Sequence, residues 1–319
     1  VYKRQLSTRP VIIYIHGGAF VLGNKNSTDC IDFCESFAKR GYVAVSINYR
    51  LSDFFTWFSS KQEQYKSIIR AVYDSKAAVR YLRRSFEAGN NYGIDTSSIF
   101  AGGWSAGGAT AIHHAFVDNL TDLPDSLIEN DGSIFNLQSL ASNIGGIYGL
   151  EGDAGNYGYS SKISGVISFA SGIIETSLID QYDEPLASVH GSNDLSVNYN
   201  CSPLFGNPAV MTICGPGEMH PQANSEAIIN DELVFTGVDH YWPEYGHLNP
   251  NFTQAVNFTS DFLYPLLPCN TISSINEEIT NKKLLKIKNL LGKETNASYN
   301  EILFYIYDDG TVEKKLIIQ

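Results

Sequence analysis

Short apolar runs alternate with longer amphipathic segments along most of the chain. Six runs rich in Val and Ile predict β-strands: VIIYIHG, YVAVSINYR, SIFAGGWS, ISGVISFAS, PLASVHGS and NDELVFTGVDH. Among the early runs, the pattern predicts helices at about residues 29–40 and 63–85 and a third that begins at about residue 106. Continuously apolar strands that alternate with helices are typical of a parallel sheet covered on both faces. The sequence therefore predicts an α/β fold.

Two regions depart from this alternation. Residues 122–162 are polar and rich in glycine, which is typical of a lid or cap-like excursion, and loops of that length often border active sites. After a domain over residues 6–268, a polar linker (269–280) leads into a small β tail over 281–319. In this tail we expect short antiparallel strands with Asp309-Gly310 as a hairpin turn.

Composition limits the class of partner. The 319 residues suffice for one large α/β domain with a small appendage, and the net charge is −12. Binding to duplex nucleic acid needs clustered Lys and Arg, so no nucleic-acid partner is expected. An acidic surface also weakens attachment to anionic membranes. We find no run of about 18 apolar residues that would span a bilayer.

The cysteines and the N-terminus bear on cellular location. Five cysteines lack metal-ligand spacing, so we expect no metal site: Cys30, Cys34, Cys201, Cys214 and Cys269. They fit buried apolar side chains, or one or two disulfides of unknown pairing in an exported protein. The first residues, VYKRQ, resemble a translated adapter from DNA library preparation, so our hypothesis is that Val1–Gln5 are not native and that the gene is truncated. The lack of a signal peptide then says nothing about location.

The segment IFAGGWSAGGATAIHHA places Ser105 among glycines where a predicted strand meets a predicted helix. A nucleophilic serine in a G-x-S-x-G motif stands on a strained turn of this kind, where only small neighbours fit. Gly103 and Gly107 lie two residues on either side, where larger side chains would collide. The motif alone also matches an incidental serine in a glycine-rich turn, so the neighbouring elements have to decide between a nucleophilic serine and an incidental one.

The segment YIHGGAF, at the end of the first predicted strand, fits a loop whose backbone N–H groups bind an oxyanion. The N–H of Ala106, directly after the serine, would complete that site. We expect His16 to form structural hydrogen bonds, because the motif uses the backbone of the loop. A plain turn with two glycines is the alternative interpretation.

The acid and the base should follow later strands. Asp194 lies just past PLASVHGS, where its carboxylate can accept a hydrogen bond from an imidazole, although an Asx-turn is the alternative. Asp180 and Asp183 lie in an earlier connecting loop and rank below it. His240 directly follows a strand in TGVDH, whereas His247 comes seven residues later, so we favour His240 as the base.

The remaining histidines are weaker candidates for the base. His113 and His114 lie in the helix predicted after the serine, where packing or surface roles are expected. His220 looks like a loop residue. The order Ser105, Asp194, His240 is that of the triad in α/β-hydrolases.

These motifs resemble those of α/β-hydrolases of the carboxylesterase and lipase type with an HGG(G/A)F oxyanion motif. More narrowly, the chain is similar to secreted esterases of Bacteroidetes, a group from which polyester (PET) hydrolases have been reported. The resemblance covers about residues 10–268 through YIHGGAF, RGYVAVSINYRL, YDSKAAVRYLRR, YGIDTSSIFAGGWSAGG, GLEGDAGNYGYSSKISGVI, HGSNDLSVNY and GVDHYWPEYGH. In the chain, Asn198 stands where the family commonly has proline, and two strands that usually precede the oxyanion strand are absent.

The resemblance implies roles for individual residues. Ser105 would be the nucleophile, His240 the general base and Asp194 the acid that orients it. The oxyanion N–H groups would come from Gly18, Ala19 and Ala106, with Gly17 as a lesser contributor. Ester hydrolysis would then proceed through an acyl-enzyme without a metal or cofactor.

Four aromatic residues are candidates for the substrate cleft, although an ordinary core position is the alternative for each: Phe20, Trp104, Tyr241 and Trp242. They suit aryl or apolar acyl groups, whereas the polyester reading depends on the resemblance alone. A binding module that has lost catalysis and a serine peptidase on the same fold are the competing functions.

Residues 281–319 separately resemble the C-terminal sorting tail of the type IX secretion system, through LLGKET and FYIYDDGTVEKK. This resemblance implies that the secretion machinery is a partner and that the protein is secreted or held at the cell surface. The tail would then serve as an address and take no part in catalysis.

Overall fold

The computed structural model describes residues 8–268, 283–289, 292–296, 302–308 and 312–316. Contacts between residues divide the chain into two compact units. One unit spans Ser7–Leu267, and the other contains the residues from Pro268 onward. We describe each unit by itself.

The larger unit is built on a sheet of six parallel strands in the order β10-β7-β6-β3-β1-β2. The strands are β1 (Arg9–Ile15), β2 (Val43–Ile47), β3 (Ile94–Trp104), β6 (Val166–Phe169), β7 (Leu186–Gly191) and β10 (Asn230–Phe235). Each corresponds to one of the six apolar runs, so the predicted parallel sheet is confirmed. Strand β1 lies between β2 and β3, so the loop that follows β1 lies beside the carboxyl end of β3.

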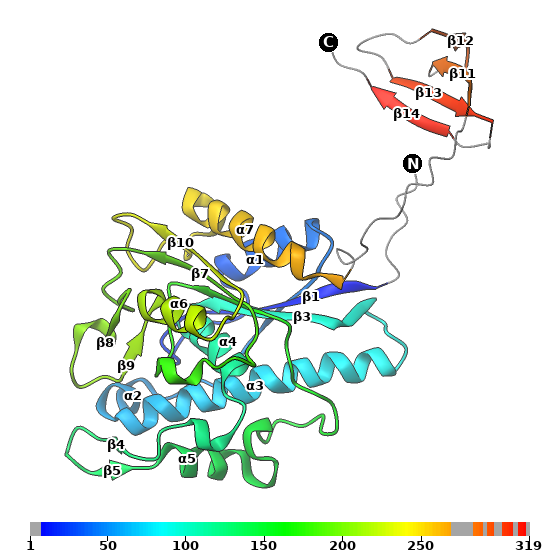
Figure 1. Cartoon of the computed structure of the whole chain (residues 1–319). Helices are drawn as coiled ribbons and strands as arrows, with labels where there is room; N and C mark the ends of the chain where they lie inside the picture. The colour runs from blue at the N-terminus through cyan, green and yellow to red at the C-terminus, as the bar shows by residue number, and fades with distance from the viewer. Residues whose placement is uncertain (1–7, 269–282, 290–291, 297–301, 309–311, 317–319) are drawn as a thin grey trace. The chain divides into compact units, whose positions relative to one another are not determined.

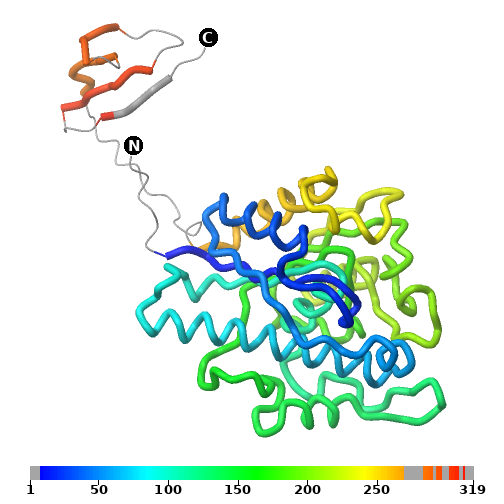
Figure 2. The backbone as a smooth tube through the Cα atoms, turned by 180° about the vertical axis from the view of Figure 1, so that it is seen from behind, coloured from blue at the N-terminus to red at the C-terminus, as the bar shows by residue number. Residues whose placement is uncertain are grey.

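Helices cover both faces of this sheet (Figure 1). On one face lie α1 (Thr28–Lys39) and α7 (Pro250–Leu263), which run close together when the chain is seen from behind (Figure 2). The other face carries α3 (Lys61–Glu87), α4 (Ala106–Phe116) and α6 (Pro216–Ser225).

The sequence of β1 explains why both faces are covered. Successive side chains of a strand point to opposite faces. Ile12 and Tyr14 belong to the core cluster that contains Phe33 of α1 and Phe252 of α7. Val11, Ile13 and Ile15 belong to the other cluster, with residues of α3 and α4. A strand that is apolar at every position therefore needs a helical layer on each side.

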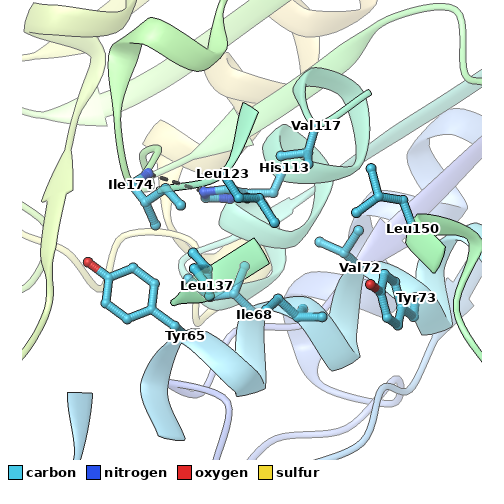
Figure 3. A pocket seen from close by; sticks show the side chains of 11 residues that line it. Tyr65, Ile68, Val72, Tyr73, His113, Val117, Leu123, Leu137, Leu150 and Ile174 are labelled. Carbon is cyan, nitrogen blue, oxygen red and sulfur yellow. Dashed lines mark hydrogen bonds between the residues drawn. The ribbon is translucent and has the colours of Figure 1, made fainter. Parts of the chain in front are cut away.

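The glycine-rich excursion over residues 122–162 contains two strands, an α-helix and a 3₁₀ helix (Gly146–Glu151), and it packs against α3. It forms a two-stranded hairpin, β4 (Leu127–Ile128) and β5 (Ile134–Phe135), followed by α5 (Leu137–Gly145). Leu137 and Leu150 line a small apolar cavity of about 20 Å³ together with side chains of α3 (Figure 3). None of its residues lines the two cavities beside Ser105 described below, so the excursion forms no wall of either cavity. Its leucines close the core over α3 instead.

The smaller unit is an antiparallel sheet in the order β12-β11-β13-β14. Its strands are β11 (Leu284–Asn289), β12 (Glu294–Thr295), β13 (Ile302–Tyr307) and β14 (Val312–Leu316). The predicted short antiparallel strands are therefore confirmed. The predicted turn at Asp309-Gly310 lies outside the described residues. In the described part of the chain, no helix is both long and apolar enough to cross a membrane.

Candidate active site

Ser105 occupies a tight turn between β3 and α4. Its backbone has φ 53° and ψ −120°, in the left-handed half of conformational space that residues other than glycine rarely adopt. A Cβ atom on Gly103 or Gly107 would lie 2.4 Å or 1.9 Å from the carbonyl oxygen of Ile15. Both glycines are therefore required for the approach of the turn to β1. The hydroxyl of Ser171 donates a hydrogen bond of 2.6 Å to the Ser105 carbonyl and holds the turn from the other side.

The structure brings Ser105, His240 and Asp194 together in one chain of hydrogen bonds. His240 Nε2 lies 2.9 Å from Ser105 Oγ, and His240 Nδ1 lies 2.7 Å from Asp194 Oδ2. Asp194 follows β7 and His240 follows β10, and the carboxyl ends of parallel strands meet at one edge of a sheet. A carboxylate at Nδ1 places the ring proton there and leaves Nε2 free to accept the serine proton.

Asp194 is held by backbone groups although its side chain is buried. Its Oδ1 accepts hydrogen bonds from the N–H groups of Ser196 at 2.9 Å and Val197 at 2.8 Å. Such bonds compensate a buried carboxylate for lost hydration. A second histidine, His190, places Nε2 3.4 Å from Asp194 Oδ2 and 2.9 Å from the Val197 carbonyl oxygen. Burial lowers the pKa of His190, which keeps this ring neutral beside the carboxylate.

The loop after β1 bends sharply beside Ser105. Three successive residues have positive φ: Gly18 at 119°, Ala19 at 50° and Phe20 at 63°. A Cβ on Gly18 would lie 2.1 Å from the carbonyl oxygen of Leu22, so only glycine fits that position. Ala19 and Ala106 both line the cavity that Ser105 lines. Their N–H groups take part in no hydrogen bond among the described residues, as expected of donors reserved for a ligand.

Two cavities meet at Ser105 and His240. The smaller one has a volume of about 30 Å³ and an apolar wall that includes Ala109, Met211 and Ile213. The larger one has a volume of about 380 Å³, and the residues that line it include Leu22, Trp104 and Glu244. The site therefore offers a tight apolar compartment and a roomier cleft, and Ser105 lines both.

Three of the four predicted aromatic residues line these cavities. Phe20 contributes to the smaller cavity, and Trp104 and Tyr241 contribute to the larger one. Trp104 Nε1 also donates a 3.2 Å hydrogen bond to the His240 carbonyl oxygen, which ties the loop of the base to the turn of the serine.

The prediction for Trp242 is wrong. Its side chain is only 1% exposed and packs against Phe169 and Phe235, with ring centroids 5.2 Å and 5.3 Å away. Because Tyr241 and Trp242 are neighbours in the chain, the turn that points the first side chain toward the cleft turns the second into the core. The same interior cluster contains residues of α1 and α7.

The other histidines have structural partners. His247 Nε2 lies 2.7 Å from Ser36 Oγ and its Nδ1 lies 2.8 Å from Thr253 Oγ1, so it has no part in the site. His16 lies 2.7 Å from the Gly17 carbonyl oxygen and stacks on Tyr49, which fits the expected structural role.

The two histidines of α4 are interior residues. His113 Nδ1 donates to the Ala109 carbonyl and Nε2 accepts the N–H of Ile174, with burial lowering its pKa to about 4 (Figure 3). His114 lies between Ser75 and the Ser161 carbonyl, and burial lowers its pKa to about 3. Both rings are packing residues, which agrees with one of the two roles expected for them.

His220 and the two earlier aspartates also lie elsewhere. His220 lies in α6 and not in a loop, with Nδ1 2.7 Å from Asn230 Oδ1, so that expectation is corrected. Its side chain is buried because α6 packs against the sheet. Asp180 and Asp183 form a local turn in which the N–H of Asp180 donates to Asp183.

One disulfide is present in the described part of the chain. Cys201 and Cys214 are joined and link the hairpin strands β8 (Cys201–Pro203) and β9 (Thr212–Cys214). Cys30 and Cys34 are free, and burial raises the pKa of both thiols to about 12. Cys269 lies outside the described residues. The described residues contain no group of three or more His, Cys, Asp or Glu side chains able to hold a metal ion.

Comparisons with known sequences point to esterases. A protein-family model named BD-FAE matches residues 1–150. The para-nitrobenzyl esterase of Bacillus subtilis is 36% identical over 100 residues, which cover 31% of this chain and 19% of the esterase. A 3-O-acetylpapaveroxine carboxylesterase of Papaver somniferum is 52% identical over 44 residues, or 14% of each chain. The matched stretches thus span less than a fifth of these curated relatives.

Solved structures match over most of the chain. An esterase from Thermogutta terrifontis with bound propionate has a TM-score of 0.54 at 18% identity, covering 82% of this chain and 85% of that one. The same esterase has been solved phosphorylated by paraoxon. A truncated carbohydrate esterase from gut microbiota has a TM-score of 0.54 at 17% identity, covering 82% and 88% of the two chains. The chain has the α/β-hydrolase fold.

Proposed function

We propose that this protein hydrolyses carboxylic esters through an acyl-enzyme formed on Ser105. The observation that carries the proposal is the chain of hydrogen bonds from Ser105 through His240 to Asp194, which opens onto cavities lined by Ala19. A nucleophile, a base, an orienting carboxylate and adjacent N–H donors are the elements of serine acyl transfer. The esterases among the sequence relatives support the same chemistry.

In the first half-reaction, Ser105 Oγ bonds to the acyl carbon as its proton passes to His240 Nε2. The N–H groups of Ala19 and Ala106, with that of Gly18, stabilise the oxyanion, each by about 3 kcal/mol in the transition state. The C–O bond to the alcohol then breaks, and His240 returns the proton to the departing alcohol. Asp194 stabilises the imidazolium throughout without itself taking the proton.

In the second half-reaction, water replaces the alcohol. His240 takes a proton from the water, whose oxygen attacks the acyl carbon of the acyl-enzyme. When the tetrahedral intermediate collapses, the bond to Ser105 Oγ breaks and His240 returns the proton to the serine. The products are a carboxylic acid, the alcohol released earlier and the free enzyme.

The sizes of the two cavities favour a short acyl group. We assign the acyl group to the apolar cavity of about 30 Å³, whose wall includes Ala109 and Met211, and the alcohol to the cleft of about 380 Å³. In a series of p-nitrophenyl esters, kcat/KM should peak at acetate to butyrate and fall for longer chains. A steady rise toward decanoate would reverse the assignment of the two cavities.

The decisive test of the activity compares the purified full chain with Ser105→Ala in p-nitrophenyl butyrate hydrolysis, with circular dichroism of both. Turnover by the wild type that disappears in a folded variant supports the proposal. A folded wild type without turnover, or a variant that keeps it, contradicts the proposal.

Two further proposals rest on resemblance. Polyesters such as PET are a candidate substrate, tested by the release of terephthalate from a PET film by wild type and by Ser105→Ala. We also propose that residues 281–319 direct export through the type IX machinery to the cell surface or medium. Fused to a reporter behind a signal peptide, they should direct its secretion in a type IX-competent strain and not in a mutant lacking the machinery. Reporter kept inside both strains would contradict this.

A further inference from the structure

Four phenylalanine side chains lie exposed in one connected row, which we call the aromatic strip: Phe54, Phe55, Phe58 and Phe205. Their exposed fractions are 50%, 80%, 36% and 43%. Phe54 contacts Phe55 and Phe58, with ring centroids 5.6 Å and 4.8 Å away, and Phe58 lies 6.2 Å from Phe205. Single exposed apolar residues are ordinary, but a contiguous apolar patch marks an interaction site.

The strip leads to the reactive serine. Phe205 lines both cavities that contain Ser105 and His240. Beneath the strip, Trp57 contacts Phe58 at 4.8 Å and lines the smaller cavity, and it is fully buried. The apolar surface is therefore continuous from solvent to the edge of the active site.

The fold holds Phe205 in an unfavourable conformation. Its backbone has φ 58°, which is a strained value for a bulky side chain, and its N–H donates a 2.9 Å hydrogen bond to the Ser196 carbonyl. The Cys201–Cys214 disulfide closes the hairpin that carries it. Strain of this kind persists where the surrounding structure imposes it, and here it puts the ring between the strip and the cavities.

The other three rings are presented by the short helix α2 (Phe54–Ser59). Asp53 caps this helix by accepting the N–H of Thr56 at 3.0 Å, and Trp57 Nε1 donates to Ser67 at 3.0 Å. Trp57 alone anchors the helix in the core, so the three exposed rings add no comparable burial.

The charge around the strip favours a neutral partner. Within residues 51–60 the only charged side chain is Asp53. Arg50, just before this segment, is paired with Asp74 and Asp153. With a net charge of −12 and no basic residue in the strip, an anionic membrane would be repelled.

We propose that the aromatic strip binds the surface of a water-insoluble, uncharged ester and presents its ester groups to Ser105. This inference rests on the proposed esterase activity for its function, but the binding itself does not depend on catalysis. Rings at an apolar surface lose contact with water, which favours adsorption.

The binding test uses the full chain with Ser105→Ala in every sample, so that no substrate is consumed. The protein is mixed with a tributyrin emulsion, and the fraction that floats with the droplets is measured. Adding Phe54→Ser and Phe55→Ser should lower the partition coefficient at least 10-fold. The matched control adds Tyr182→Ser, since Tyr182 is 79% exposed and lies outside the strip, and should leave it unchanged.

Equal flotation of the strip variant and the Tyr182 control would overturn the proposal. Stronger binding to phosphatidylglycerol vesicles than to tributyrin would overturn it as well, because the strip would then serve a membrane. Circular dichroism of each variant separates loss of binding from loss of fold.

A second measurement uses the active serine. The ratio of tributyrin emulsion hydrolysis to hydrolysis of soluble p-nitrophenyl acetate should fall about 10-fold in Phe54→Ser/Phe55→Ser and stay constant in Tyr182→Ser. An unchanged ratio would contradict the proposed role of the aromatic strip and would leave the proposed esterase activity unaffected. A wild type without any turnover would contradict the proposed esterase activity. The flotation experiment would then still test whether the aromatic strip binds the droplets.

Discussion

Two serine–histidine pairs with almost the same contact distance lie at opposite ends of α4, since Ser105 precedes its first residue and His114 is in its last turn. Ser105 Oγ lies 2.9 Å from His240 Nε2, and Ser75 Oγ lies 2.8 Å from His114 Nδ1. The second nitrogen of His240 faces the Asp194 carboxylate, whereas that of His114 faces the Ser161 carbonyl. Ser75 is fully buried, while Ser105 lies at the meeting point of two cavities.

The comparison shows that contact between a serine and a histidine does not by itself define a reactive pair. Burial lowers the pKa of His114 to about 3, with the charge of Lys76 adding to the effect, and its two ring nitrogens contact the Ser75 hydroxyl and the Ser161 carbonyl, neither of which carries a charge that would stabilise an imidazolium. Beside Ser105, free N–H groups and space for a substrate accompany the carboxylate. Charge stabilisation and access thus distinguish a catalytic pair from a structural one.

The largest effect should come from removing each serine. We expect Ser105→Ala to lower kcat for p-nitrophenyl butyrate by at least about 10⁴-fold, because the nucleophile is lost. Ser75→Ala should leave kcat within about 2-fold and lower the free energy of unfolding by about 1–3 kcal/mol, since His114 loses a buried partner. Comparable loss of kcat in both folded variants would remove the distinction between the two pairs.

The next largest effect should come from the carboxylate that only one pair has. Asp194→Asn should lower kcat by about 10⁴-fold, because an amide can stabilise the wrong tautomer of His240 and cannot stabilise its cation. The control is Asp183→Asn, which alters a carboxyl with a pKa raised by burial to about 7 and no contact with His240. Steady-state kinetics should show no change in that variant. An active Asp194→Asn enzyme would mean that another group orients the base.

A smaller effect is expected from the oxyanion loop. Gly18→Ala would place a Cβ 2.1 Å from the Leu22 carbonyl oxygen, at a φ of 119°. The resulting shift of the N–H groups should lower kcat by about 100-fold. Gly41→Ala has a comparable φ of 95° with nothing within 4 Å, so its backbone strain is matched and kcat should not change. Equal kcat values for the two variants would mean that this loop takes no part in the reaction.

The smallest effect concerns the free energy of unfolding and its dependence on His114, which pairs with Ser75. The pKa of His114 is lowered to about 3, so below pH 6.5 the unfolded state takes up a proton that the folded state does not. The stability contributed by neutral His114 is therefore present above pH 6.5 and is lost as the pH falls toward 3. Relative to His114→Gln, the wild type should lose about 1.4 kcal/mol of unfolding free energy per pH unit between about pH 6 and pH 4.

Urea titrations at several pH values measure this difference. The carboxyls of Asp183 and Glu184, whose pKa values burial raises to about 7, titrate in both proteins and cancel in the comparison. A difference that does not vary with pH would mean that His114 is protonated in the folded protein.

Local pattern was sufficient for the sheet and for the three side chains that the structure joins by hydrogen bonds, Ser105, His240 and Asp194. Gly103 and Gly107 mark the turn of Ser105 in the sequence itself, because their lack of a side chain is the local requirement. Asp194 and His240 each follow a strand, and parallel strands bring those ends together without any knowledge of distant contacts.

Residues that depend on tertiary packing could not be predicted in this way. Tyr241 and Trp242 are equally aromatic neighbours, and only the packing of Trp242 on Phe169 separates a cleft residue from a core residue. Phe205 reaches the cavities from a hairpin closed by a disulfide, and His190 reaches Asp194 from the preceding strand. Phe205 lies in none of the motifs quoted above, and although His190 begins HGSNDLSVNY, nothing in that motif indicates its contact with Asp194.

The most direct test of the central claim is covalent labelling of the full chain by paraoxon, followed by mass spectrometry of the intact protein and its peptides. The account predicts one diethylphosphoryl group per chain, on the peptide that contains Ser105, and no label in Ser105→Ala. An unlabelled folded protein, or a label on the peptide that contains Ser75, would contradict it.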